Sequence, residues 1–339
     1  FKQKTAYEIY QCDWSSDVCS SDLFNLKYYM NFLITMVCPK KCSFCFSKKT
    51  KDEMSLEDFK RYADIAIDVL DQSHVGFVGG EPTAHPNLVS MMEYVLYEKN
   101  RPVALFTNLL GPEDTIEGIT NILSGPKKDD VTIIWNNSEF YEQFSERQQK
   151  ITLAAATKLS NLTSKILFSW TYRKGSKASP FVDISRITGI DKIRFAFNVS
   201  EMHELILPDT VDELISELEI VNSSDIMLTN DGCGFIPPPP HIKLRQYLKI
   251  MSYFNNYNRC PGSALDVLTD GRVIPCLPYF DETKDLFLTD VLSFDHLNEL
   301  IKHHYGAQAQ KTPYKGGLCP AHYQREKPTQ QQVVNFFKS

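Results

Sequence analysis

Three cysteines within eight residues carry the clearest chemical signal in the chain. Cys38, Cys42 and Cys45 follow the spacing C-x3-C-x2-C. Thiolates are soft ligands that suit iron–sulfur clusters and zinc, and one loop can bring three of them to one face of a cluster. A cubane cluster has four irons, so this loop leaves one iron without a protein ligand. Because structural sites mostly have four protein ligands, the count indicates an open metal position.

A second set of candidate metal ligands lies in the C-terminal part. It consists of Cys260, Cys276, Cys319 and His322, and Cys260, Gly271 and Cys276 follow the spacing C-x10-G-x4-C. Imidazole replaces thiolate at some clusters, and a Cys3His set also suits structural zinc. The identity of this second metal and of its fourth ligand therefore stays open.

Cys233, in the segment Asp231-Gly232-Cys233-Gly234, is a further candidate. A lone cysteine is most often a buried inert thiol, and the functional alternatives are a metal ligand or a proton or hydrogen donor. Asp231 is a candidate general base, although turn-forming aspartates are commoner.

Composition limits the class of protein. The 339 residues are 42% apolar and 12% aromatic, which is typical of a globular protein with an ample core. The net charge of −6 gives no electrostatic footprint for nucleic acid. No apolar run approaches the roughly 20 residues of a membrane span, and no secretory segment is visible at the start. We therefore expect a cytoplasmic protein that binds neither nucleic acid nor membrane.

The first 23 residues need separate treatment. Residues 2–8 (KQKTAYE) and 13–23 (DWSSDVCSSDL) read as in-frame translations of a sequencing-library adapter. We therefore expect residues 1–23 to be an assembly artefact rather than native sequence, and we leave them out of fold reasoning.

Apolar runs and helical patterns alternate along most of the chain. Strands are expected at residues 31–37, 75–78, 103–107, 131–135, 165–172 and 192–198. Helices are expected from Ser55 as N-cap, and at residues 88–98, 112–123, 146–159, 182–187 and 211–221. Six strand–helix units predict a parallel sheet, an α/β fold that is a partial (β/α)6 TIM-like barrel. The cysteine loop follows the first strand and Gly79-Gly80-Glu81-Pro82 follows the second, so both are expected at one sheet edge.

The pattern changes after residue 222. Four prolines at 237–240 mark a domain boundary, and a helix is expected at 241–254. Thr269-Asp270-Gly271-Arg272, between strands at 265–268 and 273–276, predicts a β-hairpin. A helix is expected at 294–303. We therefore expect a barrel over 24–236, a smaller C-terminal region over 237–323 and a polar tail over 324–339.

The cysteine triplet followed by Gly79-Gly80-Glu81-Pro82 resembles the radical S-adenosylmethionine (SAM) enzyme superfamily over residues 31–221. The resemblance implies a partial (β/α)6 barrel in which Cys38, Cys42 and Cys45 bind three irons of a [4Fe–4S] cluster. SAM would chelate the fourth iron and be cleaved reductively to methionine and a 5′-deoxyadenosyl radical. That radical would abstract a hydrogen atom from a peptide or small-molecule substrate.

The same resemblance implies contacts with SAM. Phe44 would lie near the adenine, and Glu81 would accept hydrogen bonds from the methionine ammonium beside the close backbone of Gly79 and Gly80. Polar residues at later strand ends are candidates for ribose and carboxylate contacts, although each could equally be a surface or satisfied buried group. They are Asn108, Asn136, Ser169, Thr171 and Arg173.

The C-terminal cysteines resemble the SPASM and twitch extensions of this superfamily, which hold auxiliary iron–sulfur clusters. The cysteine count favours a one-cluster, twitch-like module, but Cys319-x2-His322 stands where the family generally has C-x2-C. We therefore expect an oxidative modification enzyme with a flavodoxin- or ferredoxin-type electron donor. The alternatives are a radical SAM enzyme with structural zinc at this site and a non-catalytic metal-binding protein.

Overall fold

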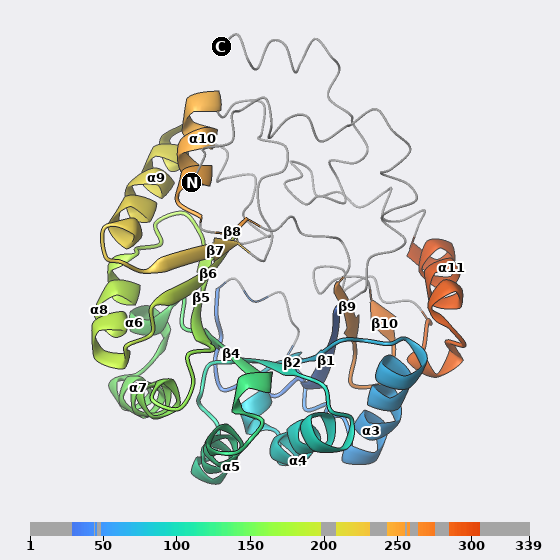
Figure 1. Ribbon diagram of the computed structural model, residues 1–339. Coiled ribbons are helices and arrows are strands. Elements are labelled where there is room, and N and C mark those ends of the chain that lie inside the picture. Colours follow the sequence, from blue (N-terminus) through green and yellow to red (C-terminus); the bar gives the residue numbers. More distant parts are fainter. Residues whose placement is uncertain are drawn as a thin grey trace, which may run out of the picture.

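The computed structural model of the chain describes residues 29–43, 45, 49–197, 208–230, 243–254, 256–257, 264–274 and 285–305. The strands in these ranges are β1 (Tyr29–Thr35), β2 (Val75–Gly79), β3 (Val103–Thr107), β4 (Val131–Asn136), β5 (Ile166–Tyr172), β6 (Lys192–Phe197), β7 (Met227–Asn230), β8 (Asn256–Tyr257), β9 (Ala264–Val267) and β10 (Val273–Ile274). They form one sheet in the order β10-β9-β1-β2-β3-β4-β5-β6-β7-β8. Neighbouring strands are parallel except β10 with β9. Figure 1 shows the sheet curving, with helices along its outer side.

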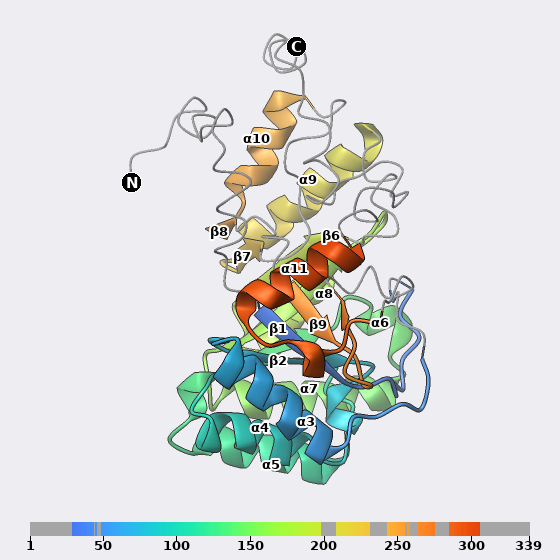
Figure 2. The same cartoon turned by 90° about the vertical axis from the view of Figure 1, so that its right-hand side faces the viewer.

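The helices connect successive strands and cover the convex face of the sheet. They are α3 (Leu56–Asp64), α4 (Leu88–Glu93), α5 (Glu113–Ser124), α6 (Phe140–Gln143), α7 (Glu146–Ser160), α8 (Ser179–Thr188), α9 (Pro208–Asn222), α10 (Leu244–Ser252) and α11 (Phe294–Tyr305). The first two continue as π-helical turns, Ile65–Val69 and Tyr94–Glu98. In Figure 2 the helices α3, α4, α5 and α7 lie together at the base of the molecule, and α9 lies beside α10.

Aromatic side chains fill the layer between the sheet and the helices. The ring of Phe59 on α3 lies 5.3 Å from that of Phe32 on β1 and 5.4 Å from that of Phe77 on β2. Trp170 on β5 lies 5.2 Å from Phe181 on α8. All five side chains are buried. Because side chains alternate along a strand, their neighbours face the concave side of the sheet.

A contact across the sheet shows how strongly it curves, and the strand order shows which strands lie at its ends. The guanidinium carbon of Arg194 on β6 lies 5.6 Å from the ring centroid of Phe106 on β3. Two strands separate β3 from β6, which would place them about 14 Å apart in a flat sheet. The long arginine side chain therefore crosses the concave face. The sheet does not close within the described residues, where β10 and β8 are its end strands.

Side chains cap two helices as their sequences require. The Ser55 hydroxyl accepts a hydrogen bond from the Asp58 backbone N–H at 3.0 Å at the start of α3. At α7, Ser145 and Gln148 form a reciprocal capping box, with N–H to side-chain distances of 3.3 and 3.0 Å. Each bond satisfies a backbone N–H that has no partner inside the helix. The predicted N-cap at Ser55 is confirmed.

The predicted hairpin is confirmed, and its position was not foreseen. Strand β9 pairs in parallel with β1 and so extends the barrel sheet at its first strand. The Gly271 N–H donates to the Leu268 carbonyl at 2.9 Å, which closes the turn into β10. The Tyr62 hydroxyl on α3 donates to the Asp270 carbonyl at 3.3 Å. The hairpin is therefore attached both to the sheet and to the helix that follows the cysteine loop.

The expected fold class is confirmed: the sheet is an open, mostly parallel α/β sheet of the partial TIM-barrel type. The six predicted strands correspond to β1 to β6 within one or two residues. Three helices differ from their predicted ranges by more than two residues. The helix expected at 211–221 begins earlier, at Pro208. The helix expected at 182–187 is longer, because Pro180 in the first turn of α8 is compatible with helix initiation. The helix expected at 241–254 spans only Leu244–Ser252 among the described residues.

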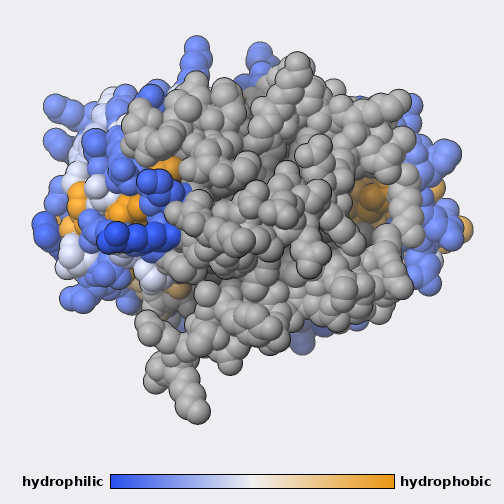
Figure 3. All heavy atoms as spheres, turned by 90° about the horizontal axis from the view of Figure 1, so that it is seen from above, coloured by the Kyte–Doolittle hydropathy of each residue, from blue (hydrophilic) through white to orange (hydrophobic). Residues whose placement is uncertain are grey.

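The described surface is mostly polar. Seen from above in Figure 3, the described rim carries predominantly hydrophilic side chains with small apolar areas. Large apolar side chains that are exposed are scattered, and the most exposed of those described is Leu292 at 78%. None of the helices in the described ranges combines the length and apolar character that crossing a membrane requires.

Candidate functional site

The cysteine loop and the Gly-Gly-Glu segment meet at the carboxyl ends of β1 and β2. The Gly80 N–H donates to the Thr35 carbonyl at 2.6 Å, and the Glu81 N–H donates to the Val37 carbonyl at 2.8 Å. A Cβ atom on Gly80 would lie 2.2 Å from the Val37 oxygen, so only glycine allows this approach. Gly79 has a φ of +137° and is restricted in the same way. The two segments therefore lie at one edge, where a parallel topology puts them.

None of the three cysteines of the loop forms a disulfide. Cys38 and Cys42 are partly buried and Cys45 is exposed. The Lys40 N–H points to the Cys38 sulfur at 3.4 Å, and the Cys45 N–H donates to the Cys42 carbonyl at 3.2 Å. Among the described residues, no three His, Cys, Asp or Glu side chains converge closely enough to hold a metal ion. The loop therefore places three soft donors at one edge, and the thiols must still draw together around a metal.

Burial raises the pKa of two of these thiols in the metal-free chain. It raises the pKa of Cys38, and it raises the pKa of Cys42 to about 11 with a further contribution from the Glu139 carboxylate. Metal binding needs thiolates, so the metal must displace the thiol protons.

Glu81 is a buried carboxylate that accepts hydrogen bonds from three residues of its own chain. Its Oε1 accepts hydrogen bonds from the Thr83 backbone N–H at 3.0 Å, the Thr83 hydroxyl at 2.6 Å and the Thr107 hydroxyl. Its Oε2 accepts one from the Asn108 backbone N–H at 2.7 Å. Burial raises the pKa of Glu81, and these hydrogen bonds oppose that rise. Among the described residues Oε2 accepts this one hydrogen bond, so its lone pairs can accept a further donor.

The turn after Glu81 is also fixed by this carboxylate. Pro82 opens a single 3₁₀ turn, Pro82–Ala84, in which Glu81 is the N-cap residue. His85 follows as a buried side chain whose Nε2 lies 3.0 Å from the Met54 carbonyl oxygen. These contacts hold the end of β2 in one conformation.

Asn108, at the end of β3, is directed toward the cysteine loop. Its Nδ2 lies 4.0 Å from the Cys38 sulfur, and its Oδ1 accepts the Leu110 N–H at 3.0 Å. The Thr152 hydroxyl of α7 donates to its backbone carbonyl at 2.7 Å. Asn108 was predicted to contact SAM; here its amide lies against a cysteine ligand.

The other polar candidates lie at the ends of β4 and β5. The Ser138 hydroxyl lies 3.4 Å from Asn136 Oδ1 and donates to the Ser169 carbonyl at 2.8 Å. The Thr171 N–H donates to the Ser138 hydroxyl at 2.8 Å. Ser138, which the sequence analysis did not single out, therefore ties the two strand ends together.

Glu139 is a second buried carboxylate that sequence reasoning missed. It is 2% exposed and accepts hydrogen bonds from both the Ser43 backbone N–H, at 3.0 Å, and the Ser43 hydroxyl. Arg173 Nη2 lies 3.2 Å from Glu139 Oε1. Arg173 thus lies at this edge, and its partner there is a carboxylate of its own chain. The available signal was a glutamate shortly after a predicted strand.

The comparison with protein families bears on the cysteine loop and the Gly-Gly-Glu segment. The model described as "Radical SAM superfamily" matches residues 32–122, which include the cysteine loop and Glu81. Over residues 32–122 the chain matches the radical SAM domain. Radical SAM proteins bind SAM and a [4Fe–4S] cluster, and the expected assignment to radical SAM enzymes is confirmed.

Solved radical SAM enzymes share the fold. SuiB from Streptococcus suis bound to precursor peptide SuiA matches with a TM-score of 0.58 and 17% identity, over 82% of this chain and 66% of that chain. SuiB bound to S-adenosylmethionine matches with 0.59 and 18%, over 91% of this chain and 77% of that chain. AnSMEcpe with bound AdoMet and Cp18Cys peptide matches with 0.53 and 13%, over 91% of this chain and 95% of that chain. In the peptide-bound SuiB match, this chain spans just under two thirds of the relative's length.

Curated protein sequences give no match to the chain. None of these comparisons shows whether the C-terminal part is a SPASM-like or twitch-like module. Seven residues of the predicted radical SAM and auxiliary sites lie outside the described residues. They are Phe44, Asp231, Cys233, Cys260, Cys276, Cys319 and His322.

The donors of the radical SAM loop fit a [4Fe–4S] cluster chemically. The three thiols are free of disulfides, and two N–H groups, from Lys40 and Asn108, point at the Cys38 sulfur. Such donors stabilise charge on a cluster thiolate. The chain supplies three ligands here, which leaves the fourth iron for SAM.

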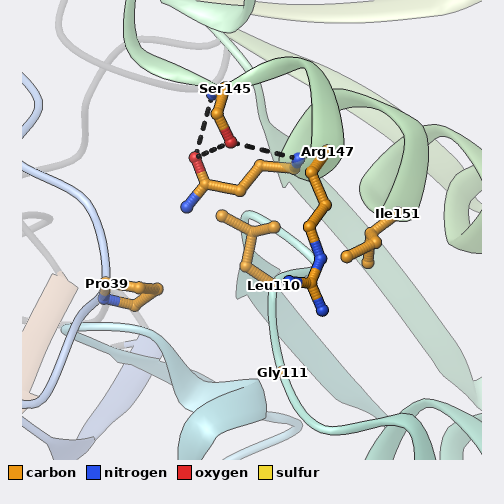
Figure 4. Close-up of a pocket in the computed structure, with 7 residues that line it drawn as sticks. Pro39, Leu110, Gly111, Ser145, Arg147 and Ile151 are labelled. Atoms are coloured by element: carbon orange, nitrogen blue, oxygen red, sulfur yellow. Dashed lines mark hydrogen bonds between the residues drawn. The ribbon is translucent and has the colours of Figure 1, made fainter.

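A pocket of about 400 Å³ lies between this loop and the start of α7. Figure 4 shows Arg147 extending between Leu110 and Ile151 toward the chain at Gly111, with Pro39 of the cysteine loop across the opening. None of the predicted SAM-contacting residues is among the described residues that line it. The pocket is therefore a separate depression beside the radical SAM site.

The Asn137 side chain and the pair formed by Asn31 and Asp266 are further polar groups that the sequence analysis did not single out. The Asn137 side chain is 2% exposed, and neither its Oδ1 nor its Nδ2 has a hydrogen-bond partner among the described residues. On the concave face, Asn31 Nδ2 donates to Asp266 Oδ1 at 2.9 Å, joining β1 to the hairpin strand β9. Sequence reasoning missed both, because only the fold brings residues 31 and 266 together.

Proposed function

We propose that the chain reductively cleaves SAM and uses the 5′-deoxyadenosyl radical to abstract hydrogen from a peptide or small-molecule substrate. The observation that carries the proposal is the meeting of the cysteine loop with the Gly79-Gly80-Glu81 segment at one sheet edge. When bound, the cluster supplies the electron for cleavage and the open iron that holds SAM. The protein positions SAM and excludes water from the reacting groups.

Each residue at this edge has a distinct task in the proposal. Cys38, Cys42 and Cys45 hold three irons. Glu81 receives the SAM ammonium through Oε2, since its Oε1 already accepts three hydrogen bonds. Gly80 lets the backbone approach closely, as its contact with Val37 requires.

Later strand ends complete the SAM site in this proposal. Asn136 and Ser169 lie on neighbouring strands at paired positions, which suits contacts with a ribose. Arg173 places a positive charge at the same edge, where its guanidinium also forms an ion pair with Glu139. Phe44 is assigned to the adenine from its place before Cys45.

A peptide is the favoured substrate class. SuiB is bound to a precursor peptide and anSMEcpe to the Cp18Cys peptide in structures that share this fold. Their identities of 17% and 13% support the fold alone, so a small molecule stays the alternative substrate. The proposed outcome is oxidative, with a flavodoxin- or ferredoxin-type protein as electron donor.

An auxiliary [4Fe–4S] cluster in the C-terminal part belongs to the same proposal. Cys260 and Cys276 flank the hairpin in sequence, and a β-hairpin brings the two outer ends of its strands together. The pairing of Val273 with Val267 and of Ile274 with Asp266 supports this. Cys319 is the third ligand, and His322 or Cys233 is the fourth. Asp231 and Cys233 are the candidate proton or hydrogen donors.

The deciding experiment is anaerobic reconstitution with iron and sulfide, followed by reduction in the presence of SAM. We expect 5′-deoxyadenosine to form, and we expect Cys42→Ser to abolish it together with most of the iron of this site. Formation of a cluster without 5′-deoxyadenosine would support the non-catalytic alternative. Product analysis with candidate precursor peptides then tests the substrate class.

Measuring the iron and zinc content distinguishes an auxiliary cluster from structural zinc at the second site. About eight irons per chain indicate two clusters, whereas about four irons with one zinc indicate structural zinc. Cys276→Ser should lower the count by about four irons if the auxiliary cluster is present. The same variant should leave the SAM-binding cluster spectroscopically intact.

A further inference from the structure

The segment that follows β4 contacts the cysteine loop on both sides of Cys42. Before it, the Lys40 ammonium donates to the Gln143 backbone carbonyl and lies 3.5 Å from the ring centroid of Phe144. After it, Ser43 donates its N–H and its hydroxyl to the two oxygens of Glu139. One short segment, 139–144, therefore anchors the loop at two points.

The charged residues of both contacts, Lys40 and Glu139, are buried. Lys40 and Glu139 are each 2% exposed, although they carry charge. A buried charge is stable only when it is paired or hydrogen-bonded, so each anchor depends on the partners described here.

Arg173 extends the contact to a third strand. Its Nη2 lies 3.2 Å from Glu139 Oε1, the oxygen that also accepts the Ser43 hydroxyl. The carboxylate therefore links the loop after β1 to the ends of β4 and β5. In a parallel sheet these ends form the edge where ligands bind.

We propose that segment 139–144 is a clamp that positions the cysteine loop for its metal, with Glu139 as the positioning residue. The proposal rests on the proposed function for the identity of the metal cluster, but the clamp itself acts in the metal-free chain. It holds the Lys40 side chain and the Ser43 backbone and hydroxyl, and it leaves the thiol side chains to close. Less conformational entropy is then lost when the cluster binds.

The clamp also sets the electrostatic surroundings of the cluster. Glu139 places a negative charge next to the residue that follows Cys42, and Arg173 balances part of it. Cluster reduction potentials depend on local charge and on hydrogen bonds near the sulfurs. Replacing the carboxylate with an amide should therefore raise the midpoint potential.

The first test uses the metal-free full chain. Glu139→Ala removes the acceptor of both Ser43 donors, and a hydrogen bond to a charged group is worth about a 10- to 100-fold change in local opening. We expect amide exchange at Ser43 to accelerate by at least tenfold. We expect the same of the pH-independent rate of Cys42 alkylation by iodoacetamide, taken from a pH profile, because that rate does not depend on the fraction of thiolate. The matched control is Glu142→Ala, which removes an exposed glutamate from the same segment.

A double variant separates positioning from general destabilisation. Ser43→Ala should accelerate Cys42 alkylation less than Glu139→Ala, and combining the two should add little, because both remove the same contact. Glu139→Gln should restore part of the protection, since its amide oxygen can still accept one Ser43 donor. Equal alkylation rates in wild type, Glu139→Ala and Glu142→Ala would overturn the clamp.

The second test uses the reconstituted chain. Glu139→Gln should lose iron to a chelator at least tenfold faster than Glu142→Gln, with a higher midpoint potential and an altered EPR spectrum of the reduced cluster. Unchanged iron loss, potential and spectrum would contradict the clamp. A wild-type chain that holds no cluster would instead contradict the proposed function, while the metal-free exchange data would still report on the clamp.

Discussion

At the residue scale, Glu81 has more partners in its own chain than its motif indicates. Four hydrogen bonds from Thr83, Thr107 and Asn108 reach its two oxygens. They join the end of β2 to the end of β3, the two strands behind the proposed SAM site. The residue thus supports the edge as well as offering one acceptor position to a ligand.

Replacing Glu81 with Gln should destabilise the fold. The new amide group is a donor and must face at least one N–H or hydroxyl that now donates to the carboxylate. Removing the buried charge offsets part of this, because burial raises the pKa of Glu81. We expect a net loss of about 1–3 kcal/mol in the free energy of unfolding, measured by urea denaturation.

The control for Glu81→Gln is Glu53→Gln. Glu53 is exposed, and the Thr35 hydroxyl lies 3.4 Å from its Oε1. This change should cost less than about 0.5 kcal/mol. Equal stabilities of the two variants would show that the four hydrogen bonds at Glu81 give no net stabilisation.

Asn108 offers a second prediction at the residue scale. Asn108→Asp keeps the Oδ1 acceptor for the Leu110 N–H but replaces the N–H donor near the Cys38 sulfur with a carboxylate oxygen. We expect a lower cluster midpoint potential and about tenfold weaker iron retention, measured by redox titration and chelator challenge. Asn121→Asp, which adds the same charge on the exposed face of α5, should change neither quantity.

At the scale of elements, the β9–β10 hairpin depends on close packing against α3. Gly271 has a φ of +86°, and a Cβ there would lie 2.3 Å from the Tyr62 hydroxyl oxygen and 2.5 Å from its ring carbon Cζ. Tyr62 is 5% exposed and has little room to move. The turn is therefore restricted both by its backbone conformation and by its neighbour.

Gly271→Ala and Gly175→Ala should separate these two restrictions. Gly175 has a similar φ of +81°, but no described atom lies within 4 Å of the place its Cβ would take, so its replacement reports the backbone cost alone. We expect about 1 kcal/mol for Gly175→Ala and at least about 1 kcal/mol more for Gly271→Ala, from thermal denaturation. Equal losses would mean that Tyr62 does not constrain the hairpin.

At the scale of the whole molecule, a polar network joins α3 to the turn that follows α4. The Tyr94 hydroxyl donates to Asp64, and the Lys99 ammonium lies 2.6 Å from both Asp64 and Asp68. Burial raises the pKa of Tyr94 to about 12, and Asp64 adds to the rise. The network makes stability depend on pH in the alkaline range.

The sign follows from the raised pKa. Unfolded tyrosine titrates near pH 10, so the stabilisation by neutral Tyr94 is complete below about pH 10 and is lost between about pH 10 and 12. At pH 11 the wild type should have lost about 1 kcal/mol that Tyr94→Phe does not lose. Urea denaturation at pH 9 and pH 11 measures this, with exposed Tyr97→Phe as the variant that should keep the wild-type pH dependence.

Local sequence patterns determined much of the fold and the outline of the site. The apolar runs that became β1 to β6 are short-range signals, because a buried strand needs contiguous apolar residues. Parallel topology then places the loops after β1 and β2 at one edge, which brought Cys38 and Glu81 together in the prediction. The cysteine triplet followed by Gly79-Gly80-Glu81-Pro82 indicated the superfamily before any contact was known.

Only the tertiary structure decided which distant groups touch. Three contacts each join segments at least 70 residues apart. They are the pairing of β9 with β1, the contact of Asn108 with the Cys38 sulfur and the hydrogen bond from Ser43 to Glu139. Hydrophobic periodicity describes which face of an element is buried and carries no information about its partner. Long-range hydrogen bonds are set by the packing of the whole sheet, so they emerge only with the fold.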